Sequence, residues 1–293
     1  MDRKVAFFVS IFIFCTLLGL YVGWRSIPAV GETNPMTGKS VDDPLGALYF
    51  LAVILIGTAI LLLVLKFYKG NLLFRIIEIY LVFVGSMMVW QFFLYDIFTA
   101  APFTVTEVTY LVAVAILSAL TVIIRFVKRT FTVMNITLAI SIAGVGGVLG
   151  SSLGFFPALL LVLALGTYDI IAVFKTKHMI HLADESRLRD MPVMFETPSK
   201  GIKTGARKGV KEEEDILGLG TGDIAIPLIF FVGVLRTFNS WLPVAGAVLG
   251  AMVGLALTLY YVTNVKRAAL PALPPIIGCS IIGLGISLLP ELF

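Results

Sequence analysis

The sequence contains few of the residues that form disulfides or bind metals. It has two cysteines, Cys15 and Cys279, and two histidines, His178 and His181. The cysteines lie in the first and last apolar runs and form no disulfide framework, so we interpret both as packing residues. The histidines share a polar segment that lacks further ligands at zinc spacing. We therefore expect no metal site, and no residue indicates an organic cofactor.

Charged residues are also scarce, at 14% of the chain, whereas 59% of the residues are hydrophobic and the mean hydropathy is +1.01. These values lie far outside the composition of soluble globular proteins. Apolar runs of about 18 or more residues recur along the whole chain, and each can cross a bilayer as a helix. The composition predicts an all-α polytopic membrane protein, with the lipid bilayer around it and no nucleic-acid partner.

Nine transmembrane helices can be drawn along the sequence. Residues 1–174 contain six of them, residues 175–215 form a polar loop, and residues 216–293 contain the last three, all in one membrane domain. The predicted spans are 4–23, 46–67, 72–94, 105–127, 131–150, 156–174, 216–235, 241–263 and 268–290.

Basic residues predict the orientation of these spans. Of the 22 Lys and Arg residues, 19 fall in one set of alternate loops, which includes residues 175–215, and only Arg25, Lys39 and Arg236 fall in the other. Because Lys and Arg concentrate on the cytoplasmic side, we expect a cytoplasmic N-terminus. An odd number of spans then places the C-terminus outside.

Two aspartates lie inside apolar runs, where a charge costs from about 3 to more than 10 kcal/mol. Asp169 lies in ALGTYDIIAVF and Asp223 in ILGLGTGDIAIP. Glu78 is also inside a predicted span, but Arg75 lies one turn earlier and can pair with it. Asp169 and Asp223 have no obvious partner except each other, so we interpret them as a pair and as the active site.

The two carboxylates also lie at similar predicted depths. Asp169 precedes Lys175 by six residues and Asp223 follows Asp215 by eight, or about 9 and 12 Å at a helical rise of ~1.5 Å per residue. Two close carboxylates in a low dielectric share a proton, so one can take a proton from water while the other gives one to a carbonyl oxygen. Aspartic proteases work on this principle. The sequence leaves open which aspartate is the base.

Glycines and prolines mark three further segments. Gly218, Gly220 and Gly222 allow a close helix approach or a loosened backbone beside Asp223. The segment AALPALPPII favours either a kinked helix entrance or an extended edge that binds an unwound substrate through its backbone. Three glycines four residues apart predict helix packing in the eighth span: Gly246, Gly250 and Gly254.

Three motifs together resemble those of a known family, the presenilin and signal peptide peptidase aspartyl proteases, with their YD, GxGD and PAL motifs. The motifs are Tyr168-Asp169, Gly220-Thr221-Gly222-Asp223 and Pro271-Ala272-Leu273. The resemblance implies catalysis by the two aspartates, with Tyr168, Gly220 and Gly222 supporting the site. It also implies substrate binding by Pro271, Ala272 and Leu273.

The same resemblance implies an aspartic endopeptidase of the cell membrane that cleaves single-span proteins within or near their transmembrane helices. The predicted orientation resembles presenilins rather than signal peptide peptidases, and the short loop is typical of a compact microbial homologue. Thr221 departs from the leucine usual at that position. The apolar patch MPVMF, at 191–195, falls where presenilins cut themselves, so self-cleavage within 190–215 is a hypothesis.

Three other functions compete with proteolysis. A proton-coupled transporter or ion-leak channel also uses buried carboxylates, although the sequence shows no second glycine-broken span with a carboxylate in a corresponding half. A prepilin-type peptidase shares a glycine-rich aspartate motif but has fewer spans, and a membrane scaffold leaves both aspartates unexplained. The sequence does not indicate the substrate, the oligomeric state or any accessory subunit.

Overall fold

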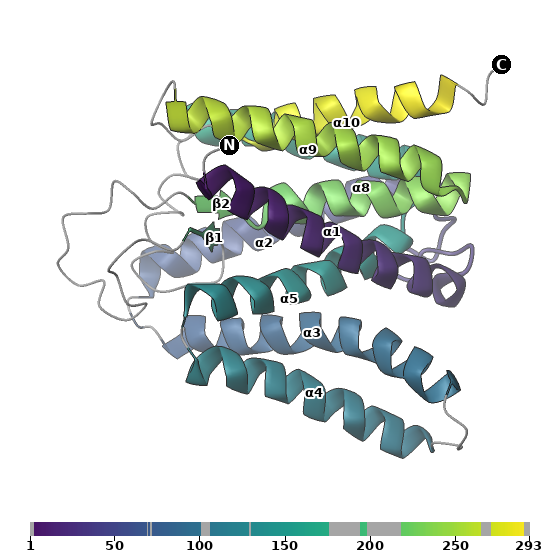
Figure 1. Ribbon diagram of the computed structural model, residues 1–293, viewed down its shortest axis with the longest axis vertical. Coiled ribbons are helices and arrows are strands. Elements are labelled where there is room, and N and C mark those ends of the chain that lie inside the picture. The colour runs from purple at the N-terminus through teal and green to yellow at the C-terminus, as the bar shows by residue number, and fades with distance from the viewer. Residues whose placement is uncertain are drawn as a thin grey trace.

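The computed structural model describes residues 3–68, 70, 72–100, 106–128, 130–175, 194–197, 218–264 and 271–289. Most of these residues are helical, and two short strands form an antiparallel sheet (Figure 1). The helices are α1 (Arg3–Val30), α2 (Pro44–Phe67), α3 (Leu72–Ala100), α4 (Glu107–Val127), α5 (Phe131–Ser151), α6 (Phe155–Ile170), α8 (Gly222–Phe238), α9 (Trp241–Asn264) and α10 (Leu273–Leu288). A π-helical turn, η1 (Ile171–Lys175), continues α6, and the strands are β1 (Met194–Glu196) and β2 (Gly218–Gly220).

Seven segments of the described chain are long and apolar enough to cross a membrane. They are α1 to α5, α6 together with η1, and α9. Helices α8 and α10 are shorter, with 17 and 16 residues. The prediction of a helical integral membrane protein is therefore confirmed, while the count of nine spans and the orientation of the ends remain predictions.

Side chains that cap the N-terminus determine where several of the helices begin. The Asp43 carboxylate accepts a hydrogen bond of 2.9 Å from the Leu45 N–H at the start of α2, and Pro44 occupies its first position. Thr106 and Thr130 begin α4 and α5 by accepting bonds of 3.3 and 3.4 Å from backbone N–H groups three residues later. These caps begin α2, α4 and α5 within two residues of the predicted limits.

Helices α1 and α3 extend beyond the predicted spans, to Val30 and Ala100. Hydropathy placed their ends at 23 and 94, because charged and aromatic residues follow. In the structure Arg25 of α1 forms an ion pair with Asp96 of α3, and the Tyr21 hydroxyl donates to the same carboxylate at 2.6 Å. The pairing neutralises the charges, and both helices continue past them.

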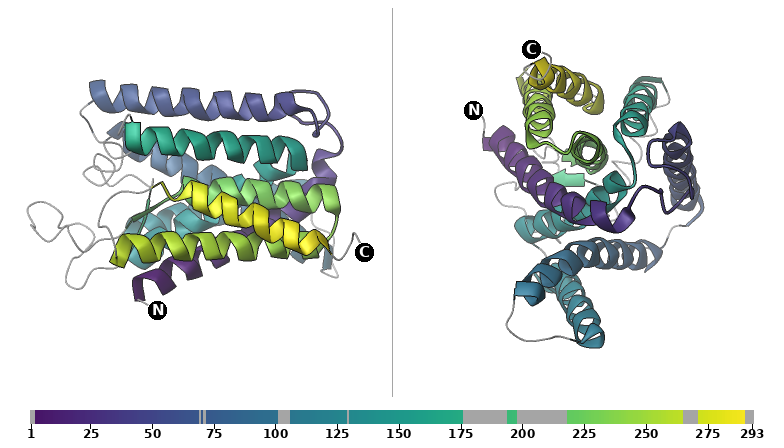
Figure 2. Two further views of the ribbon diagram at one scale, coloured as in Figure 1. Left: turned by 90° about the horizontal axis from the view of Figure 1, so that it is seen from above. Right: turned by 90° about the vertical axis from the view of Figure 1, so that its right-hand side faces the viewer.

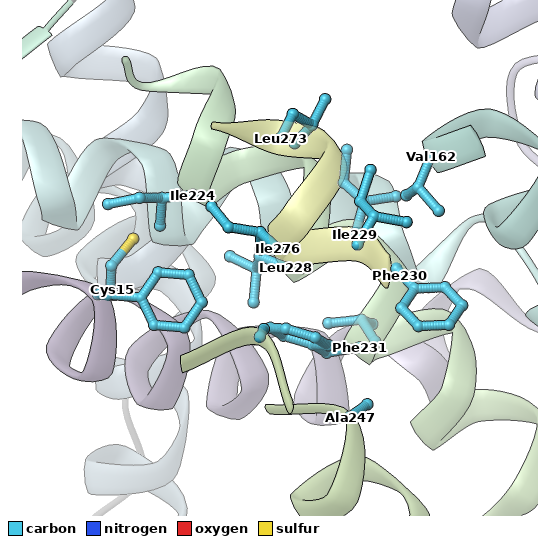
Figure 3. Packing of buried hydrophobic residues seen from close by; sticks show 14 of the residues in the cluster. Cys15, Val162, Ile224, Leu228, Ile229, Phe230, Phe231, Ala247, Leu273 and Ile276 are labelled. Carbon is cyan, nitrogen blue, oxygen red and sulfur yellow. The ribbon is translucent and has the colours of Figure 1, made fainter. Parts of the chain in front are cut away.

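Helix α8 lies at the centre of the bundle, packed against α1, α5, α6, α9 and α10 (Figures 1 and 2). Its buried side chains, including Ile224 and Leu228, meet those of neighbouring helices in one apolar core (Figure 3). Helix α4 packs on α3 and α5 at one edge, and α2 lies beside α6 at another. The start of α1 and the end of α10 lie at opposite ends of the bundle (Figure 1).

The predicted packing role of the glycines in α9 is confirmed. A Cβ atom added at Gly246, Gly250 or Gly254 would collide with the backbone of α10. Helices α9 and α10 therefore approach through their backbones, as small residues four apart permit.

Gly144 makes a second close contact, between α5 and α3. A Cβ atom at Gly144 would collide with the Gly85 carbonyl oxygen and lie 3.1 Å from the Met88 Cβ. We expect Gly144→Ala to lower the free energy of unfolding by about 1–3 kcal/mol, because a packed core accommodates an added methyl only by moving backbone. Thermal unfolding in one detergent measures the effect. Gly57→Ala is the matched control, since nothing lies within 4 Å of its Cβ; equal melting temperatures for the two variants would contradict the prediction.

The predicted pairing of Glu78 with Arg75 is wrong. The Glu78 Oε1 accepts a hydrogen bond of 2.7 Å from the Arg125 Nε of α4, and both residues are buried, with 6% and 2% exposure. The Arg125 Nη1 also donates to the Met134 carbonyl and the Thr137 hydroxyl of α5, each at 2.8 Å. Arg75 is exposed. Packing of α3 against α4 brings the partner from another helix, which sequence spacing does not show.

The prediction of one helical span over 216–235 is also wrong at its start. Residues Gly218–Gly220 form β2, which pairs antiparallel with β1, and the helix begins only at Gly222. Each glycine disfavours a helix by about 1 kcal/mol relative to alanine. Asp223 therefore lies in the first turn of α8 and not in the middle of a helix.

Candidate active site

The structure places Asp223 where β2 joins α8. The chain turns at Thr221, whose carbonyl accepts the Ile224 and Ala225 N–H groups at 3.3 and 3.0 Å. Pro227 has no N–H, so the helix lacks the hydrogen bond that would join residues 223 and 227. The first turn of α8 is therefore held more loosely than a regular helical turn, and it carries the carboxylate.

Asp169 lies in the last turn of α6, immediately before the π-helical turn η1. Its Oδ2 accepts a hydrogen bond of 3.4 Å from the Leu273 N–H at the start of α10. Helix α8, which carries Asp223 in its first turn, packs against both α6 and α10, and Asp169 and Asp223 are each partly exposed. Segments of α6, α8 and α10 that carry the three motifs thus pack together, while the roles of their residues remain predictions.

The segment Pro271-Ala272-Leu273 differs in conformation from the extended edge considered above. Ala272 has φ −84° and ψ −27°, in the helical region, and it precedes the first residue of α10. Ala272 and Leu273 are buried, whereas Pro271 is partly exposed. Pro274, which also lacks an N–H, occupies the first turn of α10 without loss, because the first N–H groups of a helix have no helical partner.

Among the residues predicted to support the site, Gly220 is one at which the structure explains why a side chain is disfavoured. A Cβ atom at Gly220 would lie 3.1 Å from the Asp223 Oδ2, tighter than a comfortable contact. At Gly222 a Cβ atom would meet only the Ile226 Cδ1, at 3.6 Å, so the structure shows no such constraint there. Tyr168 precedes Asp169 on α6 and is partly buried.

Sequence reasoning missed the sheet beside Asp223 and the residue that holds it. Phe195, in the middle of β1 and at the end of the apolar patch, is fully buried in the core. Asn135 of α5 forms two hydrogen bonds with the backbone of Glu196. A polar residue inside the apolar run FTVMNITLAIS was a signal that could have found it. The remainder of the 175–215 loop, with His178, His181 and most of the self-cleavage segment 190–215, lies outside the described residues.

In chemical terms, the described residues bring together two carboxylates, one backbone N–H donor and a strand next to one carboxylate. The described part of the chain contains no group of three His, Cys, Asp or Glu residues placed to hold a metal ion. Two carboxylates that share a proton can exchange it with water and with a carbonyl oxygen. This arrangement is therefore suited to hydrolysis by acid and base.

Comparison with known proteins gives a family and a fold. The family model described as signal-peptide peptidase, presenilin aspartyl protease matches residues 9–291. A solved structure of a presenilin family intramembrane aspartate protease in space group C222 superposes with a TM-score of 0.70 at 22% identity, covering 99% of each chain. Another, in space group P2, superposes with a TM-score of 0.66 at 24% identity, covering 97% of this chain and 96% of the other. A search of curated proteins found no match. The matched family model spans nearly the whole chain, which therefore belongs to the signal-peptide peptidase and presenilin aspartyl protease family.

Proposed function

We propose that this protein is an intramembrane aspartyl protease of the GxGD type, in which Asp169 and Asp223 form the catalytic pair. The observation that carries the proposal is the junction of α6, α8 and α10. The Leu273 N–H donates to the Asp169 carboxylate at 3.4 Å, and α8, which carries Asp223 in its first turn, packs against both α6 and α10. Three sequence motifs more than 100 residues apart from first to last thereby meet around two carboxylates.

The reaction needs only water in addition to the pair. With one proton shared, the ionised carboxylate takes a proton from water as the water oxygen attacks the carbonyl carbon of the peptide bond. The protonated carboxyl gives its proton to the carbonyl oxygen, and a tetrahedral diol forms. The first carboxyl then protonates the amide nitrogen and the other takes a diol proton as the C–N bond breaks. A carboxylic acid and an amine leave, and the pair again holds one proton.

The substrates in this proposal are single-span membrane proteins, cut within or near the transmembrane helix. The protein has the nine predicted spans, with its N-terminus in the cytoplasm, and acts in the cell membrane. Peptide bonds in a helix are shielded by their own hydrogen bonds, so the substrate must unwind beside the aspartates. Pro271, Ala272 and Leu273 are the substrate-contacting segment in this proposal, because they lie where α10 begins next to Asp169.

Cleavage of a single-span peptide by purified protein in lipid tests this function. In water enriched in ¹⁸O, we expect two fragments cut inside the apolar segment, with one ¹⁸O atom in the new carboxyl group. Mass spectrometry gives the cleavage position and the label together. Fragments that carry no label would contradict direct attack by water. Without any cleavage across a panel of such peptides, proton flux in liposomes measures the competing transport function.

The shared proton also predicts how the rate depends on pH. At low pH both carboxyls bind protons and no base remains, while at high pH the shared proton leaves and no acid remains. We expect a bell-shaped profile of kcat for the single-span peptide, with one titration on each side of the maximum. A rate that changes through a single titration would contradict catalysis by a pair.

A further inference from the structure

We propose that Asn135 is a positioning residue for Asp223, acting through the two-stranded sheet β1–β2. The inference rests on the proposed catalytic role of Asp223. Asn135 lies on α5, and its two side-chain hydrogen bonds go to β1 and not to either aspartate. The hydrogen bonds of its side chain therefore act on Asp223 through the strands.

The carboxamide of Asn135 uses both of its ends on one residue of β1. Its Nδ2 donates to the Glu196 carbonyl at 2.8 Å, and its Oδ1 accepts from the Glu196 N–H at 3.2 Å. These are the two bonds that a neighbouring strand would make. Asn135 is only 5% exposed, so the bonds are made away from water, where losing a partner leaves a buried polar group unsatisfied.

From β1 the contact continues to the loop that carries Asp223. In the antiparallel register Phe195 lies opposite Leu219 and Met194 lies opposite Gly220. Phe195 and Leu219 are 0% and 3% exposed and belong to the same core as Ile224. The Gly220 backbone lies against the Asp223 carboxylate. A shift of β1 therefore reaches that carboxylate through buried contacts.

Helix α5 is suited to fix the position of Asp223. It packs directly on α8 as well as holding β1, so one rigid element fixes both the strand before Asp223 and the helix after it. Gly146 and Gly150 of α5 permit this packing, because a Cβ atom at either would lie 2.7–2.8 Å from side chains of α8.

Variants of the Asn135 side chain can distinguish a role in positioning Asp223 from a role in stability alone. We expect Asn135→Leu, which keeps the size but removes both bonds, to lower kcat about 10- to 100-fold, as a misplacement of about 1 Å does, with little change in KM. The ratio of Asn135→Asp activity to wild-type activity at the same pH should rise as the pH falls, because a protonated carboxyl offers the same donor and acceptor. Ser141→Ala is the matched control: Ser141 is also a buried polar residue of α5, but its hydroxyl bonds to the Thr137 and Val82 carbonyls.

Hydrogen exchange provides a readout that does not depend on activity. In Asn135→Leu the amides of β2 should exchange faster than in wild type, while those of α9 should not change. If wild type cleaves no substrate, the proposed function fails, and exchange at β2 still decides whether Asn135 holds the strands. An active, folded Asn135→Leu protein with the wild-type kcat overturns the inference, as does an equal loss of kcat in Ser141→Ala.

Discussion

Alanine at either Asp169 or Asp223 is expected to lower the cleavage rate by about 1,000-fold or more. Each carboxylate has its own task in the proposed reaction, and loss of one member of a catalytic unit removes most of the acceleration that the unit provides. Asp169→Asn and Asp223→Asn should be equally inactive, although the amide keeps nearly the same shape. Initial rates on one single-span peptide, with each variant at equal concentration, measure the effect.

The control for this prediction is Asp42→Ala, which removes an exposed carboxylate from the connection between α1 and α2. It should cleave at the wild-type rate. Thermal unfolding of all five variants establishes that inactivity does not come from unfolding. A variant at 169 or 223 that cleaves at the full rate would exclude catalysis by the pair, and the buried aspartates would then favour proton transport.

Removal of Arg125 is expected to have the largest effect on stability. Arg125→Met leaves the Glu78 carboxylate buried without its partner, and breaking a buried pair in this way costs about 3–5 kcal/mol. The variant also removes the bonds to Met134 and Thr137. The double variant Glu78→Leu with Arg125→Met should recover much of the loss, because no unpaired charge remains. Equilibrium unfolding in a single detergent completes the double-mutant cycle.

An exposed ion pair offers a comparison within the same chain. Lys39 and Asp43 lie 3.8 Å apart in the connection before α2, with side chains 52% and 27% exposed. Lys39→Ala should change the free energy of unfolding by less than about 1 kcal/mol, because solvent screens such pairs. If Arg125→Met is as mild as Lys39→Ala, the buried pair contributes no more than a surface pair does.

Hydropathy and charge predicted much of this architecture. Apolar runs predicted helices wherever the structure describes a span, because a bilayer requires long apolar segments whose backbone groups pair internally. The cost of a buried charge selected Asp169 and Asp223, and the structure places them on two helices, α6 and α8, that pack against each other. That they perform catalysis remains a prediction.

The errors come from contacts between distant residues, which local patterns do not contain. Glu78 pairs with Arg125, 47 positions away, because two helices pack side by side. Gly218–Gly220 form a strand because Met194–Glu196 lie beside them, and Asn135 serves that sheet from a third element. Hydropathy scored 216–235 as one apolar run and so could not separate the strand from the helix.

The glycine contacts between α9 and α10 restrict how the protein can open. Backbones that touch at Gly246, Gly250 and Gly254 cannot slide past each other without separating the two helices. We therefore expect α9 and α10 to move as one rigid body. Leu273, at the start of α10, donates its N–H to the Asp169 carboxylate. Any movement that draws Leu273 away from the carboxylate to admit a peptide must swing α9 together with α10. Such a movement then also displaces the lipid around α9, although none of the described residues placed in the site belongs to α9.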